Sequence, residues 1–87
     1  MKKYIEVKIS LPRTKNGCLS VNAKKMTDGF WDTIKEFDPT AVEQATEFAH
    51  DFAKKCSKGN RNIIWVLDDN KRPIGAYING EKRQPRY

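Results

Sequence analysis

The stretch TAVEQATEFAHDFAKKCSKG, residues 40–59, decides how this chain folds. Thr40 and Glu43 have the spacing of a helix capping box, and Gly59 suits the left-handed residue that closes a helix. One amphipathic helix cannot bury its own apolar face, so the flanking segments must supply a sheet that covers it. That face consists of residues recurring at three- and four-residue steps: Ala41, Val42, Ala45, Phe48, Ala49, Phe52, Ala53 and Cys56.

Before this helix the sequence predicts a β-hairpin. Residues 4–11 and 18–23 alternate apolar with polar side chains, the period of a half-buried strand. The Asn-Gly pair at residues 16–17 is typical of a tight turn between two strands. The next segment, residues 26–39, is predicted as a short helix because four large apolar residues fall at helical spacing: Phe30, Trp31, Ile34 and Phe37.

After the long helix, residues 62–79 predict a second hairpin. A pairing of Trp65 with Ala76 sets a large side chain against a small one, and this side of the hairpin is assigned to the core. Three residues alternate with it and are therefore expected on the open face of the sheet, away from the helices: Ile64, Val66 and Tyr77.

These elements predict an α+β fold with the order ββααββ. Two hairpins form a four-stranded antiparallel sheet, and one long and one short helix pack on one face. Residues 1–80 are expected to form a single compact domain, and residues 81–87 a flexible basic tail. No apolar run approaches the ~20 residues of a membrane-spanning helix, so a soluble, cytoplasmic protein without membrane contact is expected.

The charges of the chain are unevenly distributed. The net charge is +6, yet residues 28–51 hold seven acidic residues and one basic residue. The other residues hold sixteen basic and four acidic side chains. We therefore expect an acidic helical layer and cationic strands and turns, an arrangement that orients an approaching polyanion.

Two sets of residues are candidates for binding nucleic acid or a nucleoprotein. On the open face, Tyr4, Lys8 and Tyr77 combine rings that can stack on bases with a cation that can hold a phosphate. The second set lies in the predicted turns and helix end, where cations need only follow a phosphate path. It consists of Arg13, Lys15, Lys24, Lys25, Lys54, Lys55, Lys58, Arg61, Lys71 and Arg72, followed by Lys82, Arg83 and Arg86 near the end of the chain.

Protein–protein contact is the alternative function. Ile64, Val66 and Tyr77 on an open sheet face could be covered by a second copy of the chain, because exposed apolar patches often mark interfaces. An acidic helix face could instead dock a basic protein or mimic phosphates, or it could simply be solvated; it consists of Glu43, Glu47 and Asp51, with Glu36 and Asp38 before them.

Catalysis has little support in the sequence, and no enzyme activity is predicted. Cys18 and Cys56 are too far apart for a zinc-finger spacing, and no metal or other cofactor is expected. Asp68 and Asp69 are candidate catalytic carboxylates, but they lie in an Asp-Asp-Asn sequence that is typical of turns. A small ribonuclease toxin is the enzyme class that remains to be considered.

No motif of a known family is present. In size, single long helix, hairpins and uneven charge, the chain resembles small proteins of phages and mobile elements, anti-CRISPR proteins among them. That resemblance implies a stoichiometric inhibitor that blocks a host nucleoprotein by occupying its nucleic-acid channel. The predicted function is thus a non-enzymatic binding module for nucleic acid or such a nucleoprotein complex.

Overall fold

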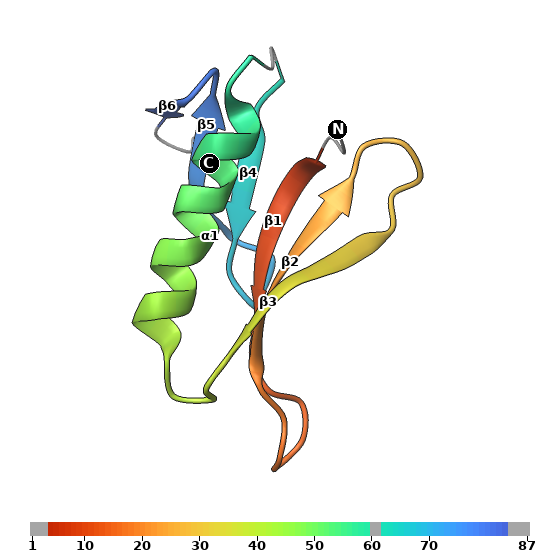
Figure 1. Ribbon diagram of the computed structural model, residues 1–87, viewed down its shortest axis with the longest axis vertical. Coiled ribbons are helices and arrows are strands. Elements are labelled where there is room, and N and C mark those ends of the chain that lie inside the picture. Colours follow the sequence, from red (N-terminus) through yellow and green to blue (C-terminus); the bar gives the residue numbers. More distant parts are fainter. Residues whose placement is uncertain (1–3, 60–61, 84–87) are drawn as a thin grey trace.

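A computed structural model describes residues 4–59 and 62–83 of the chain. It contains one helix, α1 (Val42–Ser57), that lies across one face of a single sheet (Figure 1). The strands of the sheet are β1 (Tyr4–Ser10), β2 (Leu19–Lys25), β3 (Trp31–Phe37), β4 (Ile64–Leu67), β5 (Pro73–Ile78) and β6 (Glu81–Arg83).

The predicted fold class is wrong in two respects. The sheet has six strands in the order β3-β2-β1-β4-β5-β6, and it is mixed because β4 runs parallel to β1 while the other neighbours are antiparallel. Only one helix is present in the described part of the chain, because the predicted short helix is strand β3. The α+β class and the first hairpin are confirmed.

Residues 31–37 form a strand because the preceding turn folds the chain back along β2. Gly29 has a φ of 74°, which interrupts a helix, and the Asp28 carboxylate accepts a hydrogen bond from the Phe30 amide at 2.9 Å. The Lys25 amide then donates to the Phe30 carbonyl at 2.9 Å, which begins the β2–β3 ladder. The glycine in the predicted helix was therefore a turn signal.

A bulge in β3 explains why its apolar spacing imitates a helix. Val21 pairs with Lys35 and Asn22 pairs with Thr33, so Ile34 is an extra residue in β3. The bulge changes which face the following residues point to, and Ile34 and Phe37 both pack against the core although they are three positions apart. A regular strand would send them to opposite faces.

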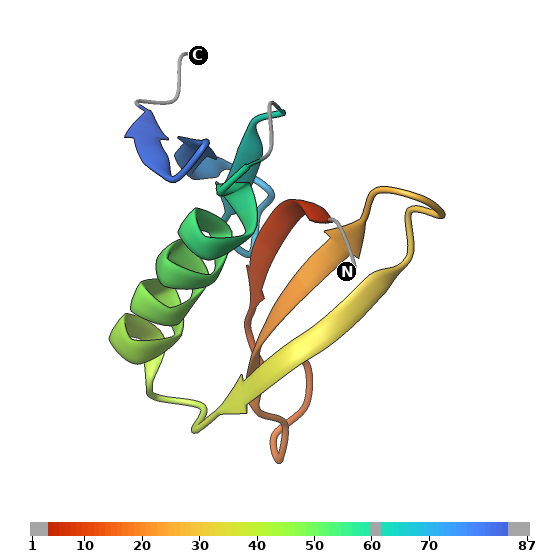
Figure 2. The same ribbon diagram turned by 45° about the horizontal axis from the view of Figure 1, so that its top comes forward.

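Helix α1 carries the chain from the sheet edge to the middle of the sheet. The chain leaves β3 at the edge, crosses one face as α1, and enters β4 beside β1 (Figure 2). The predicted second hairpin is present, with Trp65 opposite Ala76 as expected. A parallel crossover of this kind needs a helix-length connection, which residues 38–63 provide.

The core lies between α1 and the sheet. Ala45, Ala49 and Ala53 are fully buried on the predicted helix face, and the small side chains let α1 approach the strands closely. Opposite them are residues with no exposed surface from three strands, β1, β2 and β4: Val7, Leu19, Val21, Ala23, Ile64 and Val66. Phe48 and Phe52 close the sides of this layer, with Phe52 against the ring of Tyr4 at 5.7 Å.

The ends of α1 differ in part from the prediction. No side chain caps its N-terminus, because the Thr40 hydroxyl donates to the Asp38 carboxylate at 2.8 Å, so the predicted capping box is wrong. Gly59 does adopt a left-handed φ of 73° just after the helix. Within the described residues, no helix has the length and apolar character needed to cross a membrane.

Candidate nucleic-acid interface on the open sheet face

The second face of the sheet is not covered by any element in the described part of the chain, and we call it the open face. Its residues follow from strand alternation. Glu6 and Lys8 flank Val7, and Trp65 lies between Ile64 and Val66, three core residues with no exposed surface. Glu6, Lys8 and Trp65 therefore point to the open face.

One row of cross-strand partners spans the whole open face. We call it the tryptophan row, and it runs through Trp31, Lys24, Glu6, Trp65, Ala76 and Arg83 from β3 to β6. Neighbouring strands lie ~4.8 Å apart, so the two tryptophans are separated by roughly 14 Å along the row. The fold thus sets two large rings on one surface with ionisable side chains between them.

A cation lies against the ring of Trp31. The Lys8 ammonium is 5.3 Å from the centroid of the Trp31 ring, a cation–π contact. Trp31 is 39% exposed, and Phe30 beside it is 70% exposed. Ala76, the partner of Trp65 on β5, lies on the uncovered face but is only 2% exposed. Its neighbours on the two adjacent strands, Trp65 and Arg83, are both larger.

A hydrogen-bonded cluster fixes the strands next to Trp31. The Asn22 amide donates to the hydroxyls of Ser10 and Ser20 at 3.0 Å, and its carbonyl accepts from the Thr33 hydroxyl at 2.9 Å. These four side chains join β1, β2 and β3 on the open face. The cluster holds the edge strand, and therefore Trp31, in a defined position.

The open face itself is close to electrically neutral. Its basic residues Lys8, Lys24 and Arg83 are balanced by three acidic residues placed there by the register: Glu6, Glu36 and Glu81. Arg83 and Glu81 form an ion pair at 3.5 Å. Any excess of positive charge near this face must come from the loops at its rim.

Two basic loops meet at one end of the sheet. The Leu11 amide donates to the Asp69 carboxylate at 2.9 Å, which joins the β1–β2 hairpin to the β4–β5 loop. These loops carry four exposed basic residues of the predicted set: Arg13, Lys15, Lys71 and Arg72. Along β1, Lys8 lies between the loop end of this strand and the tryptophan row.

Other predicted cations lie elsewhere. Lys54, Lys55 and Lys58 are exposed at the C-terminal end of α1, on the helical layer, and Lys55 pairs with Asp51 at 3.1 Å. Lys25 is half-buried beside Asp28 and does not belong to the open face. Arg61 and Arg86 lie outside the described residues, and Lys82 pairs with Tyr77 on the helix side of the sheet. The predicted basic turns are therefore not one continuous surface.

The predicted division of charge between the layers also needs correction. Glu43, Glu47 and Asp51 are exposed on α1, as expected. Asp32 and Glu36, however, belong to β3 and therefore to the sheet, because the segment predicted as a helix is a strand. Acidic residues are thus present in both layers.

Four residues that were placed on the open face are buried beneath α1 instead. Tyr4, Ile64, Val66 and Tyr77 keep 9%, 0%, 0% and 5% of their surface. The Tyr4 hydroxyl donates to Asp32 at 3.1 Å, and burial, together with this hydrogen bond, raises the pKa of Tyr4. The dimer face predicted on Ile64, Val66 and Tyr77 is therefore part of the core.

Tyr77 belongs to a half-buried polar pair under the helix. The Nδ1 atom of His50 lies 2.9 Å from the Tyr77 hydroxyl oxygen. Burial lowers the pKa of His50, and the nearby Lys82 charge lowers it further. Burial also raises the pKa of Tyr77, with a smaller contribution from Asp51. Both shifts favour the neutral pair, which serves the packing of α1 on β5.

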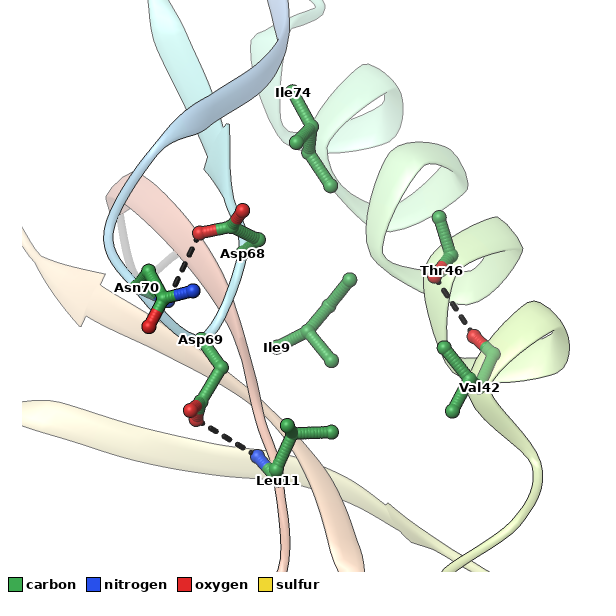
Figure 3. A pocket seen from close by; sticks show the side chains of 8 residues that line it. All are labelled: Ile9, Leu11, Val42, Thr46, Asp68, Asp69, Asn70 and Ile74. Atoms are coloured by element: carbon green, nitrogen blue, oxygen red, sulfur yellow. Dashed lines mark hydrogen bonds between the residues drawn. The ribbon is translucent and has the colours of Figure 1, made fainter.

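A cavity of about 240 Å³ lies at the other end of α1, where the helix begins (Figure 3). Its carboxylates are engaged by the protein backbone: Asp69 accepts from the Leu11 amide, and Asp68 accepts from the Asn70 and Arg72 amides at 2.9 Å. In the described residues no group of three metal-ligating side chains is present. The cavity is lined by Ile9, Leu11, Val42, Thr46, Asp68, Asp69, Asn70 and Ile74.

Sequence reasoning did not place on the open face three residues that define it: Trp31, Trp65 and Arg83. Trp31 was placed on a helix, Trp65 in the core, and Arg83 in a flexible tail. In the structure, the pair Gly75 and Ala76 distinguishes the two faces of β5. Gly75 leaves room for His50 of α1, because a Cβ atom there would lie 2.6 Å from His50 Cε1. Gly75 therefore lies on the helix side of β5, and its neighbour Ala76 lies on the open side.

Comparisons with protein-family models, curated proteins and solved structures gave no match to this chain.

Proposed function

We propose that this protein binds single-stranded nucleic acid on its open face. The observation that carries the proposal is the tryptophan row, which sets Trp31 and Trp65 on one uncovered sheet face, with Lys8 and Lys24 beside Trp31. Sheets that bind single strands use aromatic rings on which bases stack and cations that hold the backbone. Duplex DNA hides its base faces and cannot use such rings.

The charge of the open face supports a division of roles. A nearly neutral centre suits bases, whose flat faces stack without regard to charge. The phosphates of the same strand are held by the basic loops at the rim and by Lys8. Contact with about four phosphates predicts a slope near −3 for the logarithm of affinity against the logarithm of salt concentration.

Fluorescence anisotropy with a labelled single-stranded oligonucleotide of mixed sequence tests the proposal. Stacking on an aromatic side chain contributes about 1–3 kcal/mol per base. Trp31→Ala is therefore expected to weaken binding about tenfold, with Trp65→Ala at least as severe. Lys54→Glu changes an exposed residue near the end of α1, away from the open face, and serves as the control. Its affinity for the oligonucleotide should equal that of the unaltered protein, apart from a small long-range effect of the changed charge.

Circular dichroism checks that each variant is folded. The exposed position of Trp31 makes its variant the safer one to interpret. Absence of binding by the unaltered protein at low salt would overturn the proposal, as would equal affinity of the two tryptophan variants and the control.

A partner protein on the open face is the second candidate, because that face is close to neutral and bears apolar side chains on β4 and β5. Trp65, Leu67 and Ile78 are only half-buried there. Such an interface responds little to salt, whereas phosphate contacts respond strongly. Sedimentation of the free protein tests the case in which the partner is a second copy. The narrower expectation of an anti-CRISPR-like inhibitor of a host nucleoprotein stays a prediction.

A further inference from the structure

Glu6 is one of three acidic residues on the open face, and it is the one paired with a tryptophan. It lies at the middle of the tryptophan row, with Lys24 as its partner on β2 and Trp65 as its partner on β4. Within the described residues its carboxylate has no ion pair and no hydrogen bond, although a lysine lies directly opposite. Its acceptor oxygens are therefore available to a ligand.

A phosphate cannot lie against Glu6, because two like charges at contact distance repel each other. A strand that stacks on Trp65 must present another group to this carboxylate, and the polar edge of a base is the part that reaches it. A carboxylate only accepts hydrogen bonds and has two oxygens side by side, so it selects an edge with adjacent donors.

The four bases differ in that edge. Guanine has two neighbouring donors, N1–H and the N2 amino group, that match the two oxygens of a carboxylate. Cytosine and adenine have one amino group next to a ring acceptor, while thymine and uracil have one N–H between two carbonyl oxygens. The acceptors on these edges repel a carboxylate, so guanine is the base that fits best.

We infer that Glu6 makes the open face selective for guanine in a single strand, through a two-point hydrogen bond from the guanine edge to its carboxylate. The inference rests on the proposed function, because it assumes a base stacked on Trp65. Since Glu6 and Trp65 are direct partners on neighbouring strands, such a base lies beside the carboxylate. Glu6 is thus a specificity-determining residue and Trp65 the stacking residue.

A set of short thymidine oligonucleotides that differ in one central base tests this assignment. The central base is guanine, hypoxanthine, cytosine or thymine, and affinity is measured by anisotropy. The unaltered protein should bind the guanine oligonucleotide about tenfold more tightly than the all-thymidine one, a ratio typical of one good two-point base contact. Hypoxanthine lacks the N2 amino group and should fall between them.

Two isosteric variants separate the hydrogen bond from the charge. Glu6→Gln should lose the guanine preference and bind the all-thymidine oligonucleotide as well as, or better than, the unaltered protein. Glu36→Gln removes the same charge from another row of the open face and should keep the preference.

The outcomes distinguish the two proposals. If the unaltered protein binds none of the oligonucleotides, the proposed function fails and this inference fails with it. If it binds all of them with equal affinity, or if Glu6→Gln keeps the guanine preference, only the role of Glu6 is overturned. If Glu36→Gln also loses the guanine preference, the role of Glu6 is overturned as well, because the preference would then depend on the net charge of the open face.

Discussion

The two faces of the sheet are built from the same strands and differ in almost every physical property. On the helix side of β4, Ile64 and Val66 have no exposed surface. On the other side of the same strand, Trp65 and Leu67 stay half-exposed. The covered face holds the domain together through close packing, whereas the open face keeps large rings in contact with solvent. This contrast is the basis of our proposal that the open face serves a ligand.

The side chains of α1 explain how the covered face closes so well. Three alanines one helical turn apart, Ala45, Ala49 and Ala53, let the helix backbone approach the strands. Gly75 continues this close approach at His50. Interiors packed in this way respond to the change of a single methyl group, while an open surface tolerates it.

The largest expected effect comes from the same substitution on each face. Ile64→Ala should lower the free energy of unfolding by about 2–5 kcal/mol, because it leaves a cavity in a core with no exposed surface. Ile78→Ala removes the same atoms from the open side of β5 and should cost about 1 kcal/mol, since solvent can fill the space. Urea denaturation of both variants gives the comparison. Equal losses would contradict the assignment of the two faces.

Gly75 offers a test of the contact between α1 and β5. Gly75→Ala sets a methyl group against the His50 ring and should cost about 1–3 kcal/mol in stability. A second substitution, His50→Ala, makes room for that methyl group. The double variant should therefore lose clearly less stability than the sum of the two single variants. Simple additivity would show that the two residues do not meet.

The pH dependence of stability tests the burial of His50. Its folded-state pKa lies below the ordinary value of 6.5, so the unfolded chain binds a proton more readily than the folded one. The stability due to neutral His50 is therefore fully present above pH 6.5 and is lost as the pH falls through the folded-state pKa. His50→Gln should flatten this part of the curve of urea midpoint against pH. An unchanged curve would place the titration on another group.

The smallest expected effect is that of the Lys8 contact with Trp31. Lys8→Met keeps the apolar stem and removes the charge, and an exposed cation–π contact contributes about 0.5–1 kcal/mol. The loss in stability should therefore be below 1 kcal/mol, while oligonucleotide binding becomes weaker and less sensitive to salt. A large loss of stability would mean that Lys8 supports the fold and not the ligand.

The parts of the fold that the sequence predicted are those with one dominant period. The first hairpin alternates without interruption, and the stripe of α1 repeats over four turns, so both were recognised. Residues 31–37 were misassigned because the bulge at Ile34 adds one residue to a strand and imitates helical spacing. No local pattern shows a bulge before the partner strand is known.

The open face could not be assigned from sequence for a related reason. Residues 63–67 are all apolar, so periodicity does not say whether Ile64 or Trp65 points to the helix. A shift of one residue exchanges every side chain between the faces. Long-range pairing of β4 with β1 decides the matter, because it aligns Val66 with Val7 and Trp65 with Glu6. Lys8, whose strand alternates clearly, was placed correctly.

Trp31 and Trp65 are the only tryptophans of the chain, and both lie on the open face. Titration of the protein with a single-stranded oligonucleotide, followed by intrinsic tryptophan fluorescence, therefore observes the proposed site directly. Stacked bases should quench the emission to saturation, and Trp31→Phe and Trp65→Phe should each retain part of the quenching. Emission that is unchanged while the oligonucleotide binds would contradict the account, because the strand would then lie elsewhere on the molecule.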